Sequence, residues 1–174
     1  MLTPQENDLL CRVEGDAPMG ALMRQHWQPV CLTEEVPDSD GTPVKARVMG
    51  EDLVVFRDTQ GRLGVMDEYC PHRRVSLIFG RNEECGLRCL YHGWKIDVLG
   101  NVVDMPSEPS QSGLANKVKH KAYPTHEWGG FVWAFMGPSE SLKDFAPPLW
   151  APTNETRVSI SKIIIPCNWA QIVE

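Results

Sequence analysis

Two short segments in the middle of the chain each combine a cysteine with a histidine. The first reads Cys70-x-His72, and sixteen residues later the second reads Cys89-x2-His92. A zinc site with two Cys and two His ligands usually takes its cysteines from one segment and its histidines from another. Here each segment offers one sulfur and one nitrogen. The two segments together can therefore give both sulfurs to one metal ion and both nitrogens to a second.

That division of ligands is the one that a Rieske [2Fe–2S] centre requires, with two Cys on one iron and two His on the other. Neutral imidazoles leave the cluster less negative than four thiolates would, so it accepts an electron more easily. Such centres have reduction potentials of roughly −150 to +300 mV, against about −400 mV for plant-type clusters with cysteine ligands. The pattern predicts a Rieske cluster bound by Cys70, His72, Cys89 and His92. A structural zinc ion on the same side chains is the alternative.

Short segments rich in β-branched and aromatic residues surround the two motifs, and turn signals such as Asp40-Gly41 and Gly50-Glu51-Asp52 separate them. We expect strands at residues 28–33, 44–49, 53–58, 63–67, 94–98, 102–105, 118–123 and 131–136. Strands at this spacing favour a mainly-β fold, an antiparallel sandwich or small barrel. The ligand segments then fall in loops, where a rigid sheet can hold them with little slack.

The two ends of the sequence differ from this middle part. A capping box at 3–6 predicts a helix to about Val13 with Leu9 and Leu10 on its buried side. Residues 157–165 predict a strand, and 168–174 predict a helix that stops without a C-cap. We therefore expect a helical arm at 1–25, a Rieske domain at 26–137, a proline-rich linker at 138–156 and the beginning of a truncated α+β domain at 157–174, in a longer protein.

Other cysteines, histidines and aromatics near the motifs receive weaker assignments. We expect Cys11, Cys31 and Cys167 to be small core residues. Cys85 is either a loop thiol or an alternative ligand, and His120 and His126 are expected at the surface. Tyr91 and Trp94 are expected to cover the cluster and limit water, a role that is compatible with ordinary core packing.

The charge distribution bears on the partners. A formal net charge of −6 argues against nucleic acid. Residues 70–95 nevertheless carry five basic and two acidic side chains, a local net charge of +3 that could steer an acidic electron donor or simply form a solvated face. The longest apolar run, at 131–136, is too short to cross a bilayer, and the N-terminal residues do not resemble a signal peptide. We expect a cytoplasmic protein.

The motifs resemble the N-terminal part of the oxygenase subunit of Rieske non-heme iron ring-hydroxylating oxygenases, along essentially the whole chain. The resemblance is greatest to the branch of phthalate 4,5-dioxygenase and related aromatic-acid oxygenases and O-demethylases. The residues that carry it are 18–20, 26–30, 50–53, 70–73, 80–84, 87–95, 104–108, 127–130 and 167–169. The two extra cysteines of respiratory Rieske proteins are replaced here by Val75 and Tyr91, which cannot form their disulfide.

The resemblance implies that Cys70 and Cys89 bind one iron and that His72 and His92 bind the other. It implies as well that the last, truncated domain is the catalytic domain. It also implies a reductase or ferredoxin as electron donor, and a mononuclear Fe(II) that activates O2 on an aromatic, acidic substrate. That iron has a two-His, one-carboxylate site, and its Asp-x2-His-x4-His pattern does not occur before residue 174. A homotrimer is expected for the longer protein. The alternative function is a stand-alone, ferredoxin-like Rieske electron carrier, which would not need the N-terminal arm or the segment after Pro152.

Overall fold

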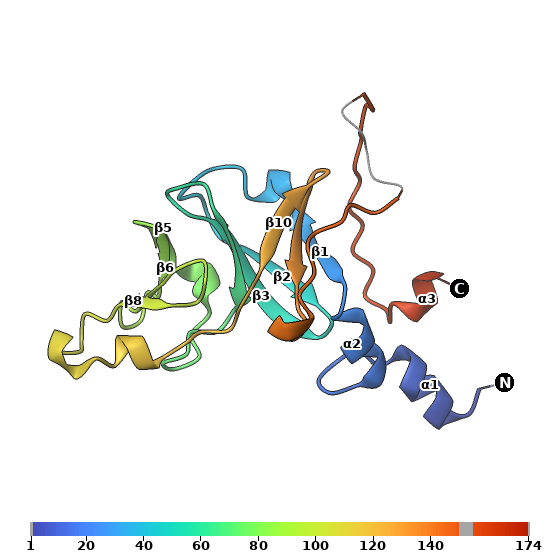
Figure 1. Ribbon diagram of the computed structural model, residues 1–174, viewed down its shortest axis with the longest axis horizontal. Coiled ribbons are helices and arrows are strands. Elements are labelled where there is room, and N and C mark those ends of the chain that lie inside the picture. Colours follow the sequence, from blue (N-terminus) through green and yellow to red (C-terminus); the bar gives the residue numbers. More distant parts are fainter. Residues whose placement is uncertain (1, 150–154, 174) are drawn as a thin grey trace.

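Three small antiparallel sheets form the body of the computed structural model, which describes residues 2–149 and 155–173 (Figure 1). The first sheet has the order β1-β11-β10 and comprises β1 (Trp27–Leu32), β10 (Thr125–Trp128) and β11 (Phe131–Phe135). The second has the order β2-β3-β4-β9 and comprises β2 (Val44–Val48), β3 (Glu51–Arg57), β4 (Leu63–Asp67) and β9 (Ala122–Tyr123). The third has the order β5-β6-β7-β8 and comprises β5 (Arg81–Glu83), β6 (Gly86–Arg88), β7 (Lys95–Ile96) and β8 (Val102–Asp104). The mainly-β prediction is confirmed.

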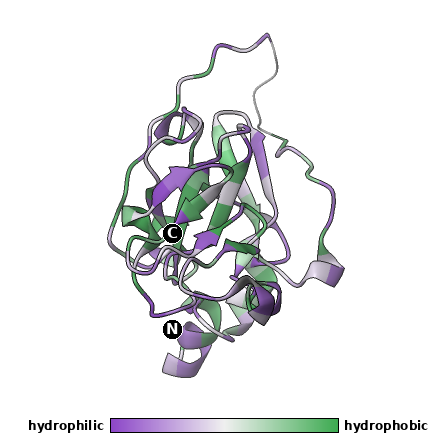
Figure 2. Cartoon of the chain, turned by 90° about the vertical axis from the view of Figure 1, so that its left-hand side faces the viewer, coloured by the Kyte–Doolittle hydropathy of each residue, from purple (hydrophilic) through white to green (hydrophobic). Residues whose placement is uncertain are grey.

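The second sheet lies between the other two, and β3 shows why. Successive side chains of a strand point to opposite faces of its sheet. Val54 and Phe56 join a core with residues of the third sheet, whereas Leu53 and Val55 join a core with β1 and β11. All four side chains are fully buried. The segment is continuously hydrophobic because both of its faces are covered, and hydrophobic strands gather inside the body (Figure 2).

Tight turns set the register of the hairpins. Met49 and Gly50 connect β2 to β3, and both have positive φ angles, of 47° and 80°. Turns of this kind match the right-handed twist of the strands that they join. The turn begins one residue before the predicted Gly50-Glu51-Asp52 segment, because Glu51 already pairs with Val48.

The N-terminal arm contains α1 (Pro4–Cys11) and α2 (Pro18–Met23). The capping box is present, since the Glu6 amide donates to Thr3 Oγ1 at 3.2 Å and the Thr3 amide donates to Glu6 Oε2 at 2.8 Å. The helix is shorter than predicted, and the prediction that Leu9 and Leu10 are buried is wrong. Their exposures are 52% and 44%. Apolar spacing identifies the face that a helix could bury, but a neighbouring element has to cover it.

At the other end, the predicted strand at 157–165 is wrong for the described chain. Residues 157–165 belong to no strand of the described ranges, and Ile163 and Ile164 are about 80% exposed. A strand requires a neighbour that accepts its hydrogen bonds, and the local sequence cannot supply one. The helix that follows is present as α3 (Ala170–Val173). Within the predicted linker, residues 150–154 lie outside the described residues.

Short 3-10 turns complete the described chain, at Thr33–Glu35, Leu77–Phe79, Ser110–Ser112, Ala115–Lys117 and Ser139–Ser141. The segment 118–123, predicted as one strand, pairs in a sheet only at Ala122–Tyr123. None of the helices in the described ranges is both long enough and apolar enough to span a membrane.

Candidate metal centre

The first ligand loop, residues 69–76, leaves the end of β4 and returns on itself. Tyr69 and Ser76 form an antiparallel bridge, and the Cys70 amide donates to the Val75 carbonyl at 2.9 Å. Inside the loop, the Arg74 amide donates to the Cys70 carbonyl at 2.9 Å. The buried Glu68 side chain accepts from Ser76 Oγ at 2.6 Å. These bonds hold Cys70 and His72 on a closed turn.

The second ligand loop, residues 89–94, connects β6 to β7. The Cys89 amide donates to the Trp94 carbonyl at 2.9 Å, and the Gly93 amide donates to the Cys89 carbonyl at 3.1 Å. Gly93 has a φ of +75°, and a Cβ there would lie 3.1 Å from Pro106 Cγ. A glycine is required at this position because the backbone is left-handed and the space is filled.

The Arg88 side chain hydrogen-bonds both to the second ligand loop and to two carboxylates. Its side chain is 13% exposed, and Nη1 donates to the Gly93 carbonyl and to Asp104 Oδ2, both at 2.7 Å. Nε donates to Glu83 Oε1 at 2.6 Å. Sequence reasoning missed this network. The Glu83 contact could be found from the hairpin register, but Asp104 is sixteen residues away and gives no local signal.

The two loops bring together all four predicted ligands as a sulfur pair and an imidazole pair. Cys70 and Cys89 are 2% and 3% exposed, and Cys89 is near enough to contribute to the raised pKa of Cys70. The rings of His72 and His92 lie 4.5 Å apart, at 61° to each other. Among the described residues, no three Cys, His, Asp or Glu side chains are grouped for a single metal ion. The ligands are instead arranged as one pair of thiols and one pair of imidazoles, which suits two metal ions with two ligands each.

The electrostatics around Cys70 and His92 favour the neutral forms of these two side chains when no metal is bound. Burial raises the pKa of Cys70 to about 11, and Cys89 adds to this, while the His72 and Arg73 amides oppose it. Loss of water and the nearby His72 and Arg73 lower the pKa of His92. Neutral imidazole is the form that binds metal, whereas each thiol must lose its proton on binding. Metal binding at this site therefore releases protons.

Two aromatic side chains cover the imidazole pair to different extents. Trp94 is 6% exposed and stacks on His72, with ring centroids 4.7 Å apart and planes 5° apart. The ring centroid of Tyr91 lies 3.8 Å from that of His92, but Tyr91 is 56% exposed. It therefore shields the His92 ring only on one side. His72 Nδ1 is buried and has no hydrogen-bond partner within the described ranges. A buried ring nitrogen of this kind fits a metal ligand.

Several weaker predictions fare differently. His120 is buried rather than exposed, and the Asp67 carbonyl oxygen, 2.8 Å from its Nε2, satisfies the buried ring; burial lowers its pKa. His126 is exposed, as predicted, and lies on β10. Cys31 is buried as predicted, whereas Cys167 is exposed. Cys85 lies in the turn between β5 and β6, where its amide donates to Thr59 Oγ1 at 2.8 Å.

Most basic side chains near the ligand loops already have acidic partners. Lys95 is buried and pairs with Glu84 at 2.9 Å, and Arg88 pairs with Glu83 and Asp104. Arg74 lies over the Tyr69 ring and contacts Asp67 at 3.4 Å. These ion pairs therefore offset much of the local net charge of +3 at residues 70–95.

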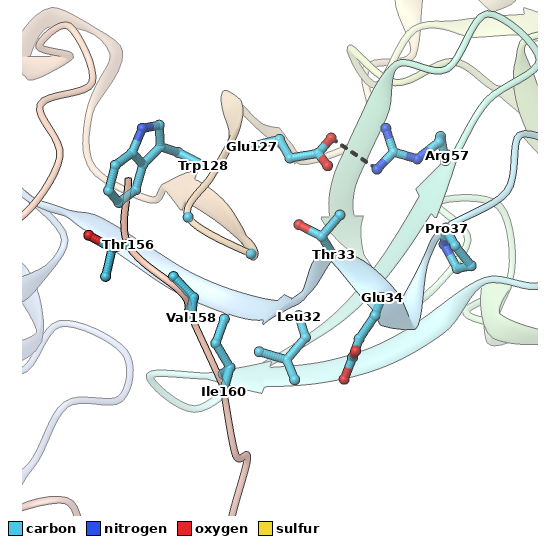
Figure 3. A pocket seen from close by; sticks show the side chains of 12 residues that line it. Leu32, Thr33, Glu34, Pro37, Arg57, Glu127, Trp128, Thr156, Val158 and Ile160 are labelled. Atoms are coloured by element: carbon cyan, nitrogen blue, oxygen red, sulfur yellow. Dashed lines mark hydrogen bonds and ion pairs between the residues drawn. The ribbon is translucent and has the colours of Figure 1, made fainter. Parts of the chain in front are cut away.

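A cavity of about 900 Å³ lies elsewhere, beside β1 and the turn between β10 and β11 (Figure 3). Its wall includes Leu32 and Ile160, together with the Arg57–Glu127 ion pair at 2.9 Å. None of the four predicted ligands lines it. The cavity is separate from the metal centre.

The family model of the Rieske [2Fe-2S] domain matches residues 26–124, and a second one, described as LigXa C-terminal domain like, matches residues 134–174. The chain therefore belongs to the Rieske [2Fe–2S] domain family, whose cofactor is a two-iron, two-sulfide cluster. The matched segment contains both ligand loops.

Two of the similar proteins are oxygenase subunits. The chain is 73% identical to the phthalate 4,5-dioxygenase oxygenase subunit of Pseudomonas putida, over all of this chain and 40% of that protein. It is 41% identical to the 5,5'-dehydrodivanillate O-demethylase oxygenase subunit of Sphingobium sp., over 98% of this chain and 40% of that protein. The chain thus spans about 40% of the length of these curated relatives.

A solved structure shares this fold. The crystal structure of dicamba monooxygenase bound to dicamba matches with a TM-score of 0.61 and 25% sequence identity, over 72% of this chain and 38% of that one. The similarity supports the arrangement of sheets described above.

Proposed function

We propose that Cys70 and Cys89 bind one iron of a Rieske cluster, and that His72 and His92 bind the other. The observation that carries this proposal is the pairing of two buried thiols beside two adjacent imidazoles, each pair built from both loops. The buried, unpartnered Nδ1 of His72 adds to it. When bound, the cluster acts as a one-electron carrier. The chain fixes its ligands on two hydrogen-bonded loops and, through Trp94, limits water on one side.

For the whole protein we propose the oxygenase subunit of an aromatic-ring oxygenase or O-demethylase. In this role the chain passes electrons from a reductase or ferredoxin to a mononuclear non-heme iron, and an aromatic acid is the substrate. The names of the two oxygenase subunits above support this proposal. We also propose the division into an arm at 1–25, a Rieske domain at 26–137, a linker at 138–156 and the beginning of a catalytic domain from 157, and a homotrimeric assembly.

Electron paramagnetic resonance of the reduced protein tests the ligand proposal. The wild type is expected to show a Rieske-type signal. In His72→Cys a thiolate replaces a neutral imidazole, so the cluster becomes more negative, the signal changes and the potential falls toward that of an all-Cys cluster. His126→Cys is the control, because His126 is exposed on β10 and its ring stacks on Phe145, away from the ligand loops. A colourless, zinc-loaded wild type would refute the proposal.

A further inference from the structure

Trp94 buries a hydrogen-bond donor beside the metal centre. Its indole Nε1 is inaccessible to water and has no partner among the described residues. Three other indole groups are satisfied, since Trp27, Trp133 and Trp169 donate to backbone carbonyls at 3.0, 3.0 and 3.1 Å. An indole N–H can only donate, and a buried one normally has an acceptor. Of these four indoles in the described residues, only that of Trp94 lacks an acceptor, and this requires an explanation.

The indole of Trp94 lies against a proposed ligand of the cluster. Trp94 stacks on His72, whose own Nδ1 is also buried and unpartnered in the described part of the chain. The Trp94 carbonyl accepts from the Cys89 amide, so Trp94 is also tied to the second sulfur ligand. Two buried, unpartnered nitrogens thus belong to two stacked rings, one of which is the ring of a proposed cluster ligand. His72 Nδ1 suits binding to an iron atom, and the Trp94 N–H suits donation to an acceptor bound to that iron.

We propose that the Trp94 indole N–H donates a hydrogen bond to a sulfur atom of the Rieske cluster and thereby raises its reduction potential. The proposal rests on the ligand assignment above. Reduction adds negative charge to the cluster, and sulfur then accepts a hydrogen bond more strongly. A donor at this position stabilises the reduced state more than the oxidised state. Trp94 is a positioning and tuning residue, since its ring also fixes the plane of the His72 imidazole.

The test compares Trp94→Phe with Trp133→Phe in the cluster-loaded protein. Phenylalanine keeps an aromatic ring against His72 but removes the N–H donor. The reduction potential of Trp94→Phe is expected to fall by on the order of 59 mV, which is a tenfold change in the equilibrium constant of a one-electron couple. Trp133→Phe also removes a buried indole donor, but its partner is the Trp128 carbonyl, so its potential is expected to equal that of the wild type.

Pulsed electron–nuclear double resonance in H2O and D2O gives a second readout. The wild type is expected to show an exchangeable proton coupled to the cluster that is lost in Trp94→Phe and kept in Trp133→Phe. Because phenylalanine is smaller than tryptophan, Trp94→Phe could lose its cluster for packing reasons. Benzothienylalanine at position 94 avoids this problem, since it replaces only the N–H group by sulfur and keeps the shape of the indole.

An unchanged potential and an unchanged proton coupling in the position-94 variants would overturn the inference, with the indole then bonded to water or to a backbone carbonyl. A wild type without a Rieske signal would instead refute the proposed function. The two failures are therefore distinguishable.

Discussion

At the scale of single residues, the candidate centre depends on positions where the side chain is small, buried or unpartnered. Cys70 and Cys89 are buried, and His72 is packed under Trp94. Gly93 allows the second loop to close next to Pro106. Each of these features restricts motion of a proposed ligand, which preorganises the site for its metal.

Gly93→Ala is expected to destabilise the protein and reduce cluster incorporation. A left-handed backbone costs a non-glycine residue roughly 1–2 kcal/mol, and the new Cβ would press on Pro106 at 3.1 Å. Gly113→Ala is the matched control, because Gly113 has a φ of +60° but a Cβ added there would meet nothing within 4 Å. Iron content and thermal denaturation measure both effects. Equal losses in the two variants would show that the contact with Pro106 is unimportant.

At the scale of elements, charged side chains connect segments that the sheets alone leave separate. Glu51 at the start of β3 pairs with Arg24 after α2 at 3.1 Å and with Lys121 beside β9 at 2.5 Å, and it accepts from the Tyr123 hydroxyl. Burial raises the pKa of Glu51, but the bonds to Lys121, Tyr123 and Arg24 more than offset it, so its pKa is lowered overall. The ionised form of Glu51 therefore holds the arm to the second sheet.

Glu51→Gln is expected to lower the free energy of unfolding at pH 7 by about 1.5–3 kcal/mol, the usual contribution of a hydrogen bond to a charged group. Because the folded pKa lies below the unfolded one, the unfolded state binds the proton more readily. The contribution is thus complete above the ordinary pKa of a glutamate and is lost as the pH falls through the lowered folded value. Urea denaturation at pH 7 and near pH 3 measures this.

The control for this substitution is Glu34→Gln, at an exposed glutamate of the 3-10 turn after β1. It is expected to leave the pH dependence of stability unchanged. A loss for Glu51→Gln that is the same at both pH values would contradict a contribution from its ionised form.

At the scale of the whole molecule, the proposed ligands belong to different sheets. The first ligand loop leaves β4 of the second sheet, and the second ligand loop lies between β6 and β7 of the third. A cluster bound to both loops joins these sheets covalently through the metal. The small third sheet, whose strands have two or three residues, gains the most from this connection.

Removal of the cluster is expected to reduce hydrogen-exchange protection in β5–β8 and in both ligand loops. Because the unfolded chain lacks this site, the free energy of binding the cluster adds to the free energy of folding. Protection of β3, which is buried on both faces, is expected to change less than that of β5–β8. The β1–β11 pair serves as the internal reference because it lies in the other core. A uniform loss across all three sheets would contradict a local role for the cluster.

The sequence by itself determined the features that depend on short spacing. The two Cys-His motifs, the capping box at Thr3–Glu6 and most of the short strands are local patterns, and their physics is local as well. The strands β5, β6 and β10 were not predicted. Residues 26–124 indeed match the Rieske domain family. The proposed ligands could therefore be named from residue types and spacing alone.

Only the tertiary structure decided features that need a partner distant in the chain. His120 alternates with lysines, yet it is buried, and the Asp67 carbonyl satisfies its ring. Residues 157–165 have the composition of a strand but pair with none in the described ranges. The unpartnered Trp94 indole became visible only when its neighbours were known. Burial and hydrogen bonding are properties of the neighbours that a residue meets, and the fold brings those neighbours together.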